Sequence, residues 1–259
     1  MIRQSMREIT LALPIHGKHN SCDPGKTFLW ALMDELLQRR GGELGIDAAC
    51  DYFKNHHYFR TREYVGVDHN LEALRRGARL HPSGRGILTR LEDFQPPQGC
   101  ADVIVSTHTL QYLAPEARLQ VADALANALT AQGLLLVQVP HDGHAPALVR
   151  RLQSHFQRVD VLYIGNGLSR LCTRLFTKKG IFGRTRLFNS RPVLALARLI
   201  ARTEARTWQR PGRQTRVCIC CTLKRHNSPS QPLDLRRYHE IEPNIFQRTH
   251  APTTSENTL

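Results

Sequence analysis

The sequence has no apolar run that approaches the length of a transmembrane helix, and it is short of acidic residues. It has 36 Lys and Arg against 22 Asp and Glu, which gives a net charge of +14. Its seven cysteines are scattered and odd in number, which favours reduced thiols over a disulfide framework. The polar beginning, Met1-Ile2-Arg3-Gln4, is not that of a signal peptide. We therefore expect a cytoplasmic protein with an ordinary core.

Spacings that would mark a metal or phosphate site are incomplete. Gly25-Lys26-Thr27 ends like a phosphate-binding loop, but Asn20 stands where the first glycine is required. His56-His57 have no carboxylate or cysteine at metal-ligand spacing, and the pair Cys218 and Cys221 has no second pair. We predict no metal site, and the chain contains no internal repeat.

The positive charge is confined to the second half of the chain. Residues 1–140 contain 15 basic and 15 acidic residues, so the whole net charge of +14 belongs to residues 141–259. Such a surface attracts phosphate-bearing or membrane-surface partners and does not determine the fold. The first half is therefore the better place to look for a neutral ligand-binding core.

Three landmarks in that half read as short buried strands that stop at polar residues. They are Leu44-Gly45-Ile46-Asp47, Tyr64-Val65-Gly66-Val67-Asp68, and Ala101-Asp102-Val103-Ile104-Val105-Ser106, which runs into Thr107 to Leu113. Strands of this kind are typical of a parallel α/β sheet. Asp68 follows Asp47 by 21 positions, and an acid at that distance is where ribose hydroxyls are usually held.

With these residues the chain resembles a class I S-adenosylmethionine (SAM) dependent methyltransferase of the methyltransferase type 11 kind. The resemblance covers about residues 28–164 and the final strand. It implies an α/β fold with a Rossmann-like, doubly wound sheet of seven strands, the last of them antiparallel, with a helical insertion before it. It also implies SAM as the cofactor, with Asp68 at the ribose.

Two positions depart from the family pattern. The first strand of the family runs into a glycine-rich turn, but this turn reads Asp47-Ala48-Ala49-Cys50-Asp51-Tyr52-Phe53, with Ala49 and Asp51 where glycines are expected. Glycine matters there because it adopts positive φ and has no Cβ. After Ile87 the family often has an acid, whereas this chain has Arg90 there and its acids, Glu92 and Asp93, follow.

The resemblance implies the following site residues. The predicted cofactor-binding residues are Asp47, Ala49, Cys50, Asp51, Asp68, His69, Leu91, Glu92, Ser106 and Thr107. The predicted catalytic residues are His108 and His141, which follow the fourth and fifth strands and can act as bases near neutral pH. Each of these histidines could instead only pack or hydrogen-bond at the mouth of the site, and Asp68 could instead cap the helix that follows it.

Composition divides the chain into five segments. We predict an N-terminal arm and helix at 1–42, a SAM-binding core at 43–164, a basic helical insertion or lid at 165–213, the final strand at 214–225, and a loosely ordered tail at 226–259. Residues 9–15 are predicted as a short strand or an apolar arm. The 16 residues between Asp47 and Tyr64 leave room for a crossover helix of about two turns.

The insertion contains a predicted helix over residues 191–208 with a one-sided arginine stripe. Arg191, Arg198, Arg202 and Arg206 lie within an arc of roughly 80° at 100° per residue, and apolar residues occupy the other side, which also contains Glu204. One interpretation is an interfacial helix in peripheral contact with anionic lipid or a lipid-linked glycan. The preferred interpretation is a lid helix over the acceptor pocket with a solvated stripe.

Three functions are compatible with these features. The first is methyl transfer from SAM to a hydroxyl or amine of a small-molecule, glycan or lipid-linked acceptor. The second is a catalytically inactive methyltransferase fold that serves as a binding or scaffold protein, which the altered turn would suit. The third is an RNA methyltransferase, suggested by the basic half. It ranks last because no RNA-binding module and no Asn/Asp-Pro-Pro-Tyr motif is present, so we expect no nucleic-acid partner.

Overall fold

The structure is a computed structural model that describes residues 5–16, 19, 21–207, 214–226 and 229–248. Its strands are β1 (Gly41–Ala48), β2 (Arg60–Asp68), β3 (Arg85–Leu88), β4 (Ala101–Thr107), β5 (Leu129–Pro140), β6 (Phe156–Ile164), β7 (Arg216–Lys224), β8 (Tyr238–Glu242) and β9 (Ile245–Arg248). Its helices are α1 (Met6–Leu11), α2 (Pro24–Gln38), α3 (Leu71–Leu80), α4 (Pro115–Ala128), α5 (Ala145–His155), α6 (Gly167–Phe176) and α7 (Arg191–Thr207), with short 3-10 turns η1 (His56–Tyr58), η2 (Leu110–Tyr112) and η3 (Leu235–Arg237).

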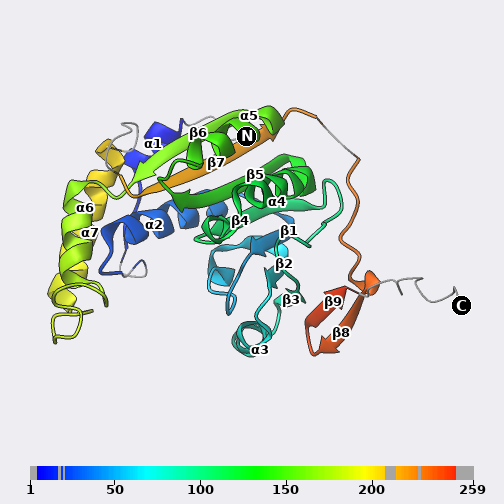
Figure 1. The fold of residues 1–259 in the computed structure, drawn as a ribbon, viewed down its shortest axis with the longest axis horizontal. Coiled ribbons are helices and arrows are strands. Elements are labelled where there is room, and N and C mark those ends of the chain that lie inside the picture. The colour runs from blue at the N-terminus through cyan, green and yellow to red at the C-terminus, as the bar shows by residue number, and fades with distance from the viewer. Residues whose placement is uncertain (1–4, 17–18, 20, 208–213, 227–228, 249–259) are drawn as a thin grey trace, which may run out of the picture.

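One mixed sheet with helices on both faces forms the protein, which confirms the predicted fold class (Figure 1). The strand order is β6-β7-β5-β4-β1-β2-β3-β9-β8. β7 runs antiparallel to both β5 and β6, as the resemblance implied. The sheet has nine strands where seven were predicted, because a hairpin of β8 and β9 extends the β3 edge.

Alternating side chains of the central strands supply the two halves of the core. In β4, Ile104 belongs to the cluster beneath α4 and α5, whereas its neighbours Val103 and Val105 belong to the cluster beneath α1, α2, α3 and α7. This alternation follows from the period of two in a strand, and burial on both faces explains why these segments read as nearly continuous apolar runs. Asp47 pairs with Gly66 of β2, so Asp47 and Asp68 lie near the carboxyl ends of adjacent strands, as predicted.

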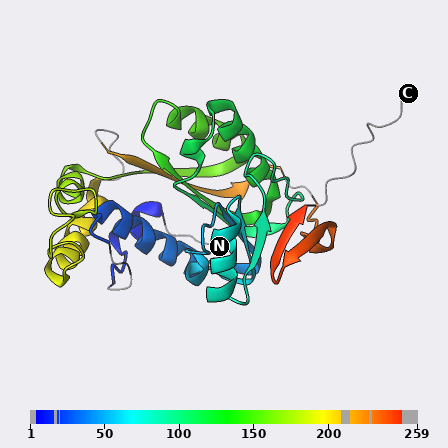
Figure 2. The ribbon, with the colours of Figure 1, turned by 60° about the horizontal axis from the view of Figure 1, so that its bottom comes forward.

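Three segments differ from what the sequence predicted. Residues 6–11 form helix α1 rather than a strand or arm, because Ser5 and Glu8 make a reciprocal capping box. The crossover between β1 and β2 contains only η1, because β2 begins as early as Arg60. Part of the tail is ordered as β8 and β9 beside β3 (Figure 2), where Glu242 pairs with Arg75 of α3.

The glycine-poor turn after β1 keeps a left-handed backbone without glycine. Ala49, Asp51 and Phe53 have φ values of 64°, 54° and 59°. The backbone N–H groups of Ala49 and Cys50 both donate to the carbonyl oxygen of Val67, at 2.8 and 3.1 Å, which fixes the turn against β2. Non-glycine residues pay about 1–2 kcal/mol for such a conformation, so the surrounding structure imposes it.

Glycines elsewhere make room for the Phe53 side chain. The ring is fully buried, and a Cβ added at Gly66 of β2 or at Gly77 of α3 would lie 2.7 Å from it. Real Cβ atoms do not approach neighbours so closely, so a side chain at either position would displace the ring. Phe53 therefore anchors the third residue of the turn in the core.

The turn geometry predicts opposite effects of glycine at two neighbouring alanines. Ala49→Gly should leave the free energy of unfolding unchanged or raise it by up to about 1 kcal/mol, because relief of the positive φ offsets the entropy of glycine. Ala48 lies in β1 and is fully buried. Ala48→Gly should therefore lower the free energy of unfolding by about 1–2 kcal/mol, because glycine has a lower strand propensity and loses the packing of the methyl group. Urea unfolding measures both, and an equal loss in the two variants would contradict the turn conformation.

Candidate active site

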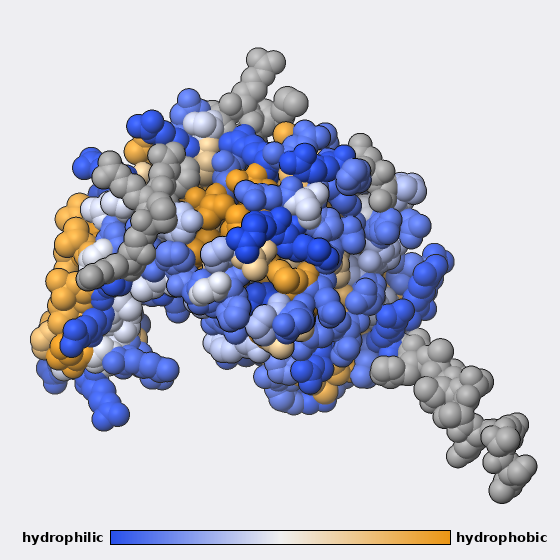
Figure 3. All heavy atoms as spheres, turned by 45° about the horizontal axis from the view of Figure 1, so that its top comes forward, coloured by the Kyte–Doolittle hydropathy of each residue, from blue (hydrophilic) through white to orange (hydrophobic). Residues whose placement is uncertain are grey.

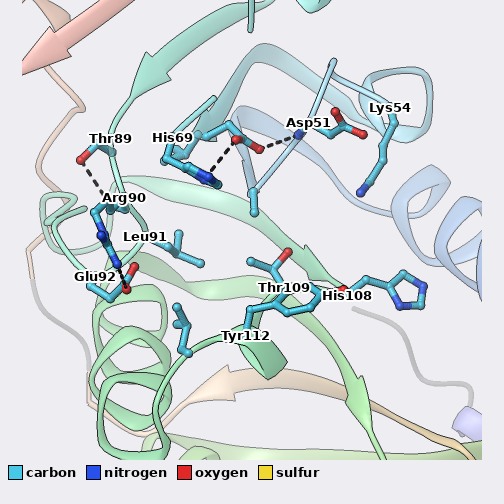
Figure 4. Close-up of a pocket in the computed structure, with 14 residues that line it drawn as sticks. Asp51, Lys54, His69, Thr89, Arg90, Leu91, Glu92, His108, Thr109 and Tyr112 are labelled. Carbon is cyan, nitrogen blue, oxygen red and sulfur yellow. Dashed lines mark hydrogen bonds and ion pairs between the residues drawn. The ribbon is translucent and has the colours of Figure 1, made fainter. Parts of the chain in front are cut away.

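A cavity of about 440 Å³ opens at the carboxyl ends of the four central strands (Figure 4). Its volume lies within the range of small-molecule sites. It is lined by Ala49, Asp51, Lys54, Val67, Asp68, His69, Thr89, Arg90, Leu91, Glu92, His108, Thr109, Tyr112 and Leu113. The order of the strands reverses at β1, which has β2 on one side and β4 on the other, and this is where open α/β sheets bind their ligands.

Asp68 lines the cavity at the end of β2, the strand between β1 and β3. Its Oδ2 accepts from the backbone N–H of Asp51 at 2.8 Å, and its Oδ1 accepts from that of Asn70 at 2.9 Å. The side chain of Asn70 caps α3, so Asp68 receives the backbone N–H of the cap residue rather than capping the helix itself. Each carboxylate oxygen can accept a second hydrogen bond, so Asp68 can still bind ligand hydroxyls that enter the cavity.

Asp47 lies behind the cavity rather than in it. It is fully buried and accepts from Asn55 Nδ2 at 3.1 Å and from Tyr64 Oη at 2.9 Å. Burial raises the pKa of Asp47 to about 6, against the lowering effect of these two donors. Because both of its oxygens face protein donors, Asp47 supports the base of the site and does not line the cavity.

One side of the cavity is formed by the residues after β3. Arg90 and Glu92 form an ion pair with an N–O distance of 3.1 Å, and Leu91 lies between them in the sequence (Figure 4). Although burial raises the pKa of Glu92, hydrogen bonds from its own backbone N–H and from Arg90 outweigh that effect and lower it. Glu92 is thus an acceptor on a wall to which Leu91 contributes an apolar side chain.

The opposite side contains a carboxylate and an ammonium group that come from the turn after β1. Asp51 and Lys54 both line the cavity there, and Figure 4 shows them on the same side as His108 and away from Arg90. Two charges of opposite sign on one wall suit a ligand that carries both an amine and a carboxylate.

His108 is a neutral imidazole at the end of β4. Its backbone has φ 61°, and its Nε2 is buried with no hydrogen-bond partner among the described residues. Burial lowers its pKa to about 4, with the nearby charges of Arg216, Lys26 and Lys54 acting in the same direction. His108 is therefore unprotonated at neutral pH, and its Nε2 is a buried acceptor that no described residue uses.

The structure separates the other predicted residues into three places. Ala49, Asp51, Asp68, His69, Leu91 and Glu92 line the cavity together with His108. Asp47, Cys50, Ser106 and Thr107 are buried around it and do not line it. His141 lies elsewhere, in a pocket of about 220 Å³ with Tyr163, and its Nδ1 lies 3.2 Å from the carbonyl oxygen of Gln214. Only one of the two predicted catalytic histidines thus faces the main cavity.

Seven cavity residues were absent from the predicted site residues: Lys54, Val67, Thr89, Arg90, Thr109, Tyr112 and Leu113. Tyr112 is 80% exposed, and such an aromatic ring just after a strand end was the signal that could have identified it. Thr109 follows His108 directly. Lys54 carried no usable signal, because a crossover helix was expected at this point and would have given its side chain another direction. Among the described residues, no group of three or more His, Cys, Asp or Glu could hold a metal ion.

Solved structures with a similar fold include SAM-dependent methyltransferases. No family model and no curated protein matches the chain. The N-methyltransferase NodS from Bradyrhizobium japonicum WM9 superimposes with a TM-score of 0.53 at 12% identity, over 78% of this chain and 97% of NodS. The structure of NodS in complex with S-adenosyl-L-homocysteine gives a TM-score of 0.50 at 14% identity, over 63% of this chain and 90% of that chain.

A second protein agrees with this result. A Listeria monocytogenes protein described as an S-adenosylmethionine-dependent methyltransferase gives a TM-score of 0.52 at 12% identity, over 77% of this chain and 97% of that chain. At such identities a structural likeness establishes the fold and leaves the activity open. The chain has the fold of the class I SAM-dependent methyltransferases.

Proposed function

We propose that the chain transfers a methyl group from SAM to a hydroxyl or amine of a small-molecule acceptor, including glycans and lipid-linked molecules. The observation that carries the proposal is Asp68, an acid at the end of β2 that lines the cavity and retains acceptor capacity. An acid at this place in a doubly wound sheet suits the two hydroxyls of a ribose.

The other walls fit the two ends of such a cofactor. The apolar side chain of Leu91 and the acceptor Glu92 suit an adenine ring with its amino group on one side of Asp68. On the other side, Asp51 suits an α-amino group and Lys54 suits an α-carboxylate. Asp51, which stands where the family pattern has its second glycine, therefore has a binding role in this proposal, because its carboxylate lines the cavity and a glycine has no side chain to bind the ligand.

When bound, SAM supplies an activated methyl group, so the chain needs to align the acceptor and exclude water. The acceptor side is the wall formed by His108, Thr109 and Tyr112. His108 is neutral at pH 7, and we assign it the role of base: an acceptor hydroxyl that reaches the buried, unpartnered Nε2 would transfer its proton there. The low pKa of His108 makes it a weak base. A weak base is sufficient for an acceptor whose nucleophilic atom has to be oriented toward the methyl group rather than deprotonated beforehand.

A second candidate function follows from the turn. Side chains of Ala49 and Asp51 line the cavity where the family pattern has glycine. A chain that keeps the fold and has lost the cofactor would be a binding or scaffold protein. Calorimetry separates the two functions, because the scaffold would release no heat with SAM or with S-adenosyl-L-homocysteine.

Replacing Asp68 tests the cofactor site. Asp68→Asn should weaken binding of S-adenosyl-L-homocysteine about tenfold or more, because a charge-assisted hydrogen bond contributes about 1.5–3 kcal/mol. Asp93→Asn changes an exposed acid outside the cavity and should leave the affinity unchanged. Titration calorimetry measures both variants, with thermal unfolding as the check on folding. Equal affinities of Asp68→Asn and the wild type would place the ribose elsewhere.

Replacing Lys54 tests the orientation of the cofactor. Lys54→Gln should weaken binding of S-adenosyl-L-homocysteine about tenfold and should change binding of 5′-methylthioadenosine less than twofold, because the latter has no carboxylate. Arg62→Gln is the control, since this side chain is 78% exposed at the other end of β2. A similar loss for both ligands would refute the assignment of the carboxylate to Lys54.

A further inference from the structure

The segment from residue 165 to residue 207 forms a helical unit at one end of the sheet, which we call the α6–α7 unit (Figure 1). Buried Glu204 fastens its two helices together. The carboxylate accepts from the backbone N–H groups of Gly165 and Asn166, at 3.1 and 3.0 Å, and from the hydroxyl of Ser169. The glutamate that interrupts the apolar pattern of α7 is thus a structural acceptor, and the start of α6 is fixed against α7.

The outer surface of this unit is unusually apolar. Nine large hydrophobic residues of the described chain are exposed, and six of them lie here. They are Leu168, Leu171, Ile181, Leu187, Leu196 and Leu199. Both helices pack instead through small or polar residues such as Ala197, Ala201 and Ser169. Figure 3 shows the corresponding hydrophobic strip along this end of the molecule, with hydrophilic residues beside it.

The same unit carries a dense positive charge. Residues 165–207 contain ten Lys and Arg and one acid, the buried Glu204. Arg170 and Arg174 are exposed on α6, and Arg202 and Arg206 are exposed on α7, in each case one helical turn apart. Arg198 of the predicted stripe is half-buried. The exposed charge therefore comes from both helices rather than from one stripe.

We infer that the α6–α7 unit docks the protein onto an anionic lipid surface. Exposed leucines flanked by arginines have the chemistry of an interfacial surface, in which apolar side chains enter the acyl boundary and cations bind headgroup phosphates. A second copy of the chain would bring like charges face to face, which opposes association. A nucleic acid would use the arginines and would leave the leucines in water.

The α6–α7 unit begins at the same edge of the sheet as the cavity. β6 runs parallel to β5, because both are antiparallel to β7. Its carboxyl end, from which α6 continues, therefore lies at the same edge of the sheet as the cavity. The inference goes beyond the proposed function and does not depend on it, because membrane binding is measured without cofactor. No described helix is long and apolar enough to cross a membrane, so the contact is peripheral.

Co-sedimentation of the full chain with phosphatidylglycerol-containing and with pure phosphatidylcholine vesicles tests this inference. The wild type should bind the anionic vesicles only, and binding should fall between 0.1 and 1 M salt, as the Debye length shortens from about 10 to about 3 Å. The variant Arg170→Gln, Arg174→Gln, Arg202→Gln, Arg206→Gln should lose binding about a hundredfold or more, since each arginine near such a surface contributes roughly fivefold.

A charge-matched control separates docking from general attraction. Arg62→Gln, Arg79→Gln, Arg150→Gln, Arg236→Gln removes the same charge from exposed positions outside the unit and should bind nearly as the wild type does. Changing Leu168, Leu171, Leu196 and Leu199 to Ser should weaken vesicle binding at least about tenfold at constant charge. The pair Leu171→Ser, Leu199→Ser gives a milder test of the same contact if the fourfold variant does not fold.

Three results would overturn the inference. The first is a wild type that ignores anionic vesicles at low salt. The second is equal binding by the two four-arginine variants. The third is that the wild type is a dimer in analytical ultracentrifugation and the leucine variant is a monomer. In that case the apolar face would bind a second copy of the chain instead of a lipid surface.

Discussion

The carboxylate of Asp68 is the contact on which the geometry of the site depends. One oxygen holds the backbone of the turn at Asp51, and the other holds the backbone of Asn70 at the start of α3. A single buried acid therefore ties the ends of β1, β2 and α3 together. Because the turn has no glycine, its left-handed residues need such external constraints to persist. Phe53, buried beside Gly66 and Gly77, supplies a second constraint from below.

Much of the fold could be predicted because its signals are local. The three apolar runs that end at polar residues became β1, β2 and β4, and the helix expected after Asp68 is α3, which Asn70 caps. The capping box of Ser5 and Glu8 was also readable and was missed. The hairpin of β8 and β9 was not readable, because it depends on pairing with β3 and on the contact of Glu242 with Arg75. Such partners are far apart in the sequence.

The site was predicted in outline, and the errors have one physical source. A strand end tells which residues reach the sheet edge, but it does not tell which of them turn into the cavity. Asp47 is buried under the side chains of Tyr64 and Asn55, and no spacing rule reveals that pairing. In the same way His141 turns toward Tyr163 while His108 faces the cavity. The charge count located the basic residues in the second half of the chain. It did not show that leucines and arginines of α6 and α7 share one exposed surface, because that requires both helices to be packed together.

The central claim is that the cavity at Asp68 is the site of an adenosyl cofactor. A crystal structure of the chain with S-adenosyl-L-homocysteine tests this claim most directly. The account predicts ribose hydroxyls within hydrogen-bonding distance of the Asp68 carboxylate, the adenine beside Leu91 and the amino acid end beside Lys54. Ligand density at another place, or an unchanged cavity in crystals grown with saturating ligand, would contradict it.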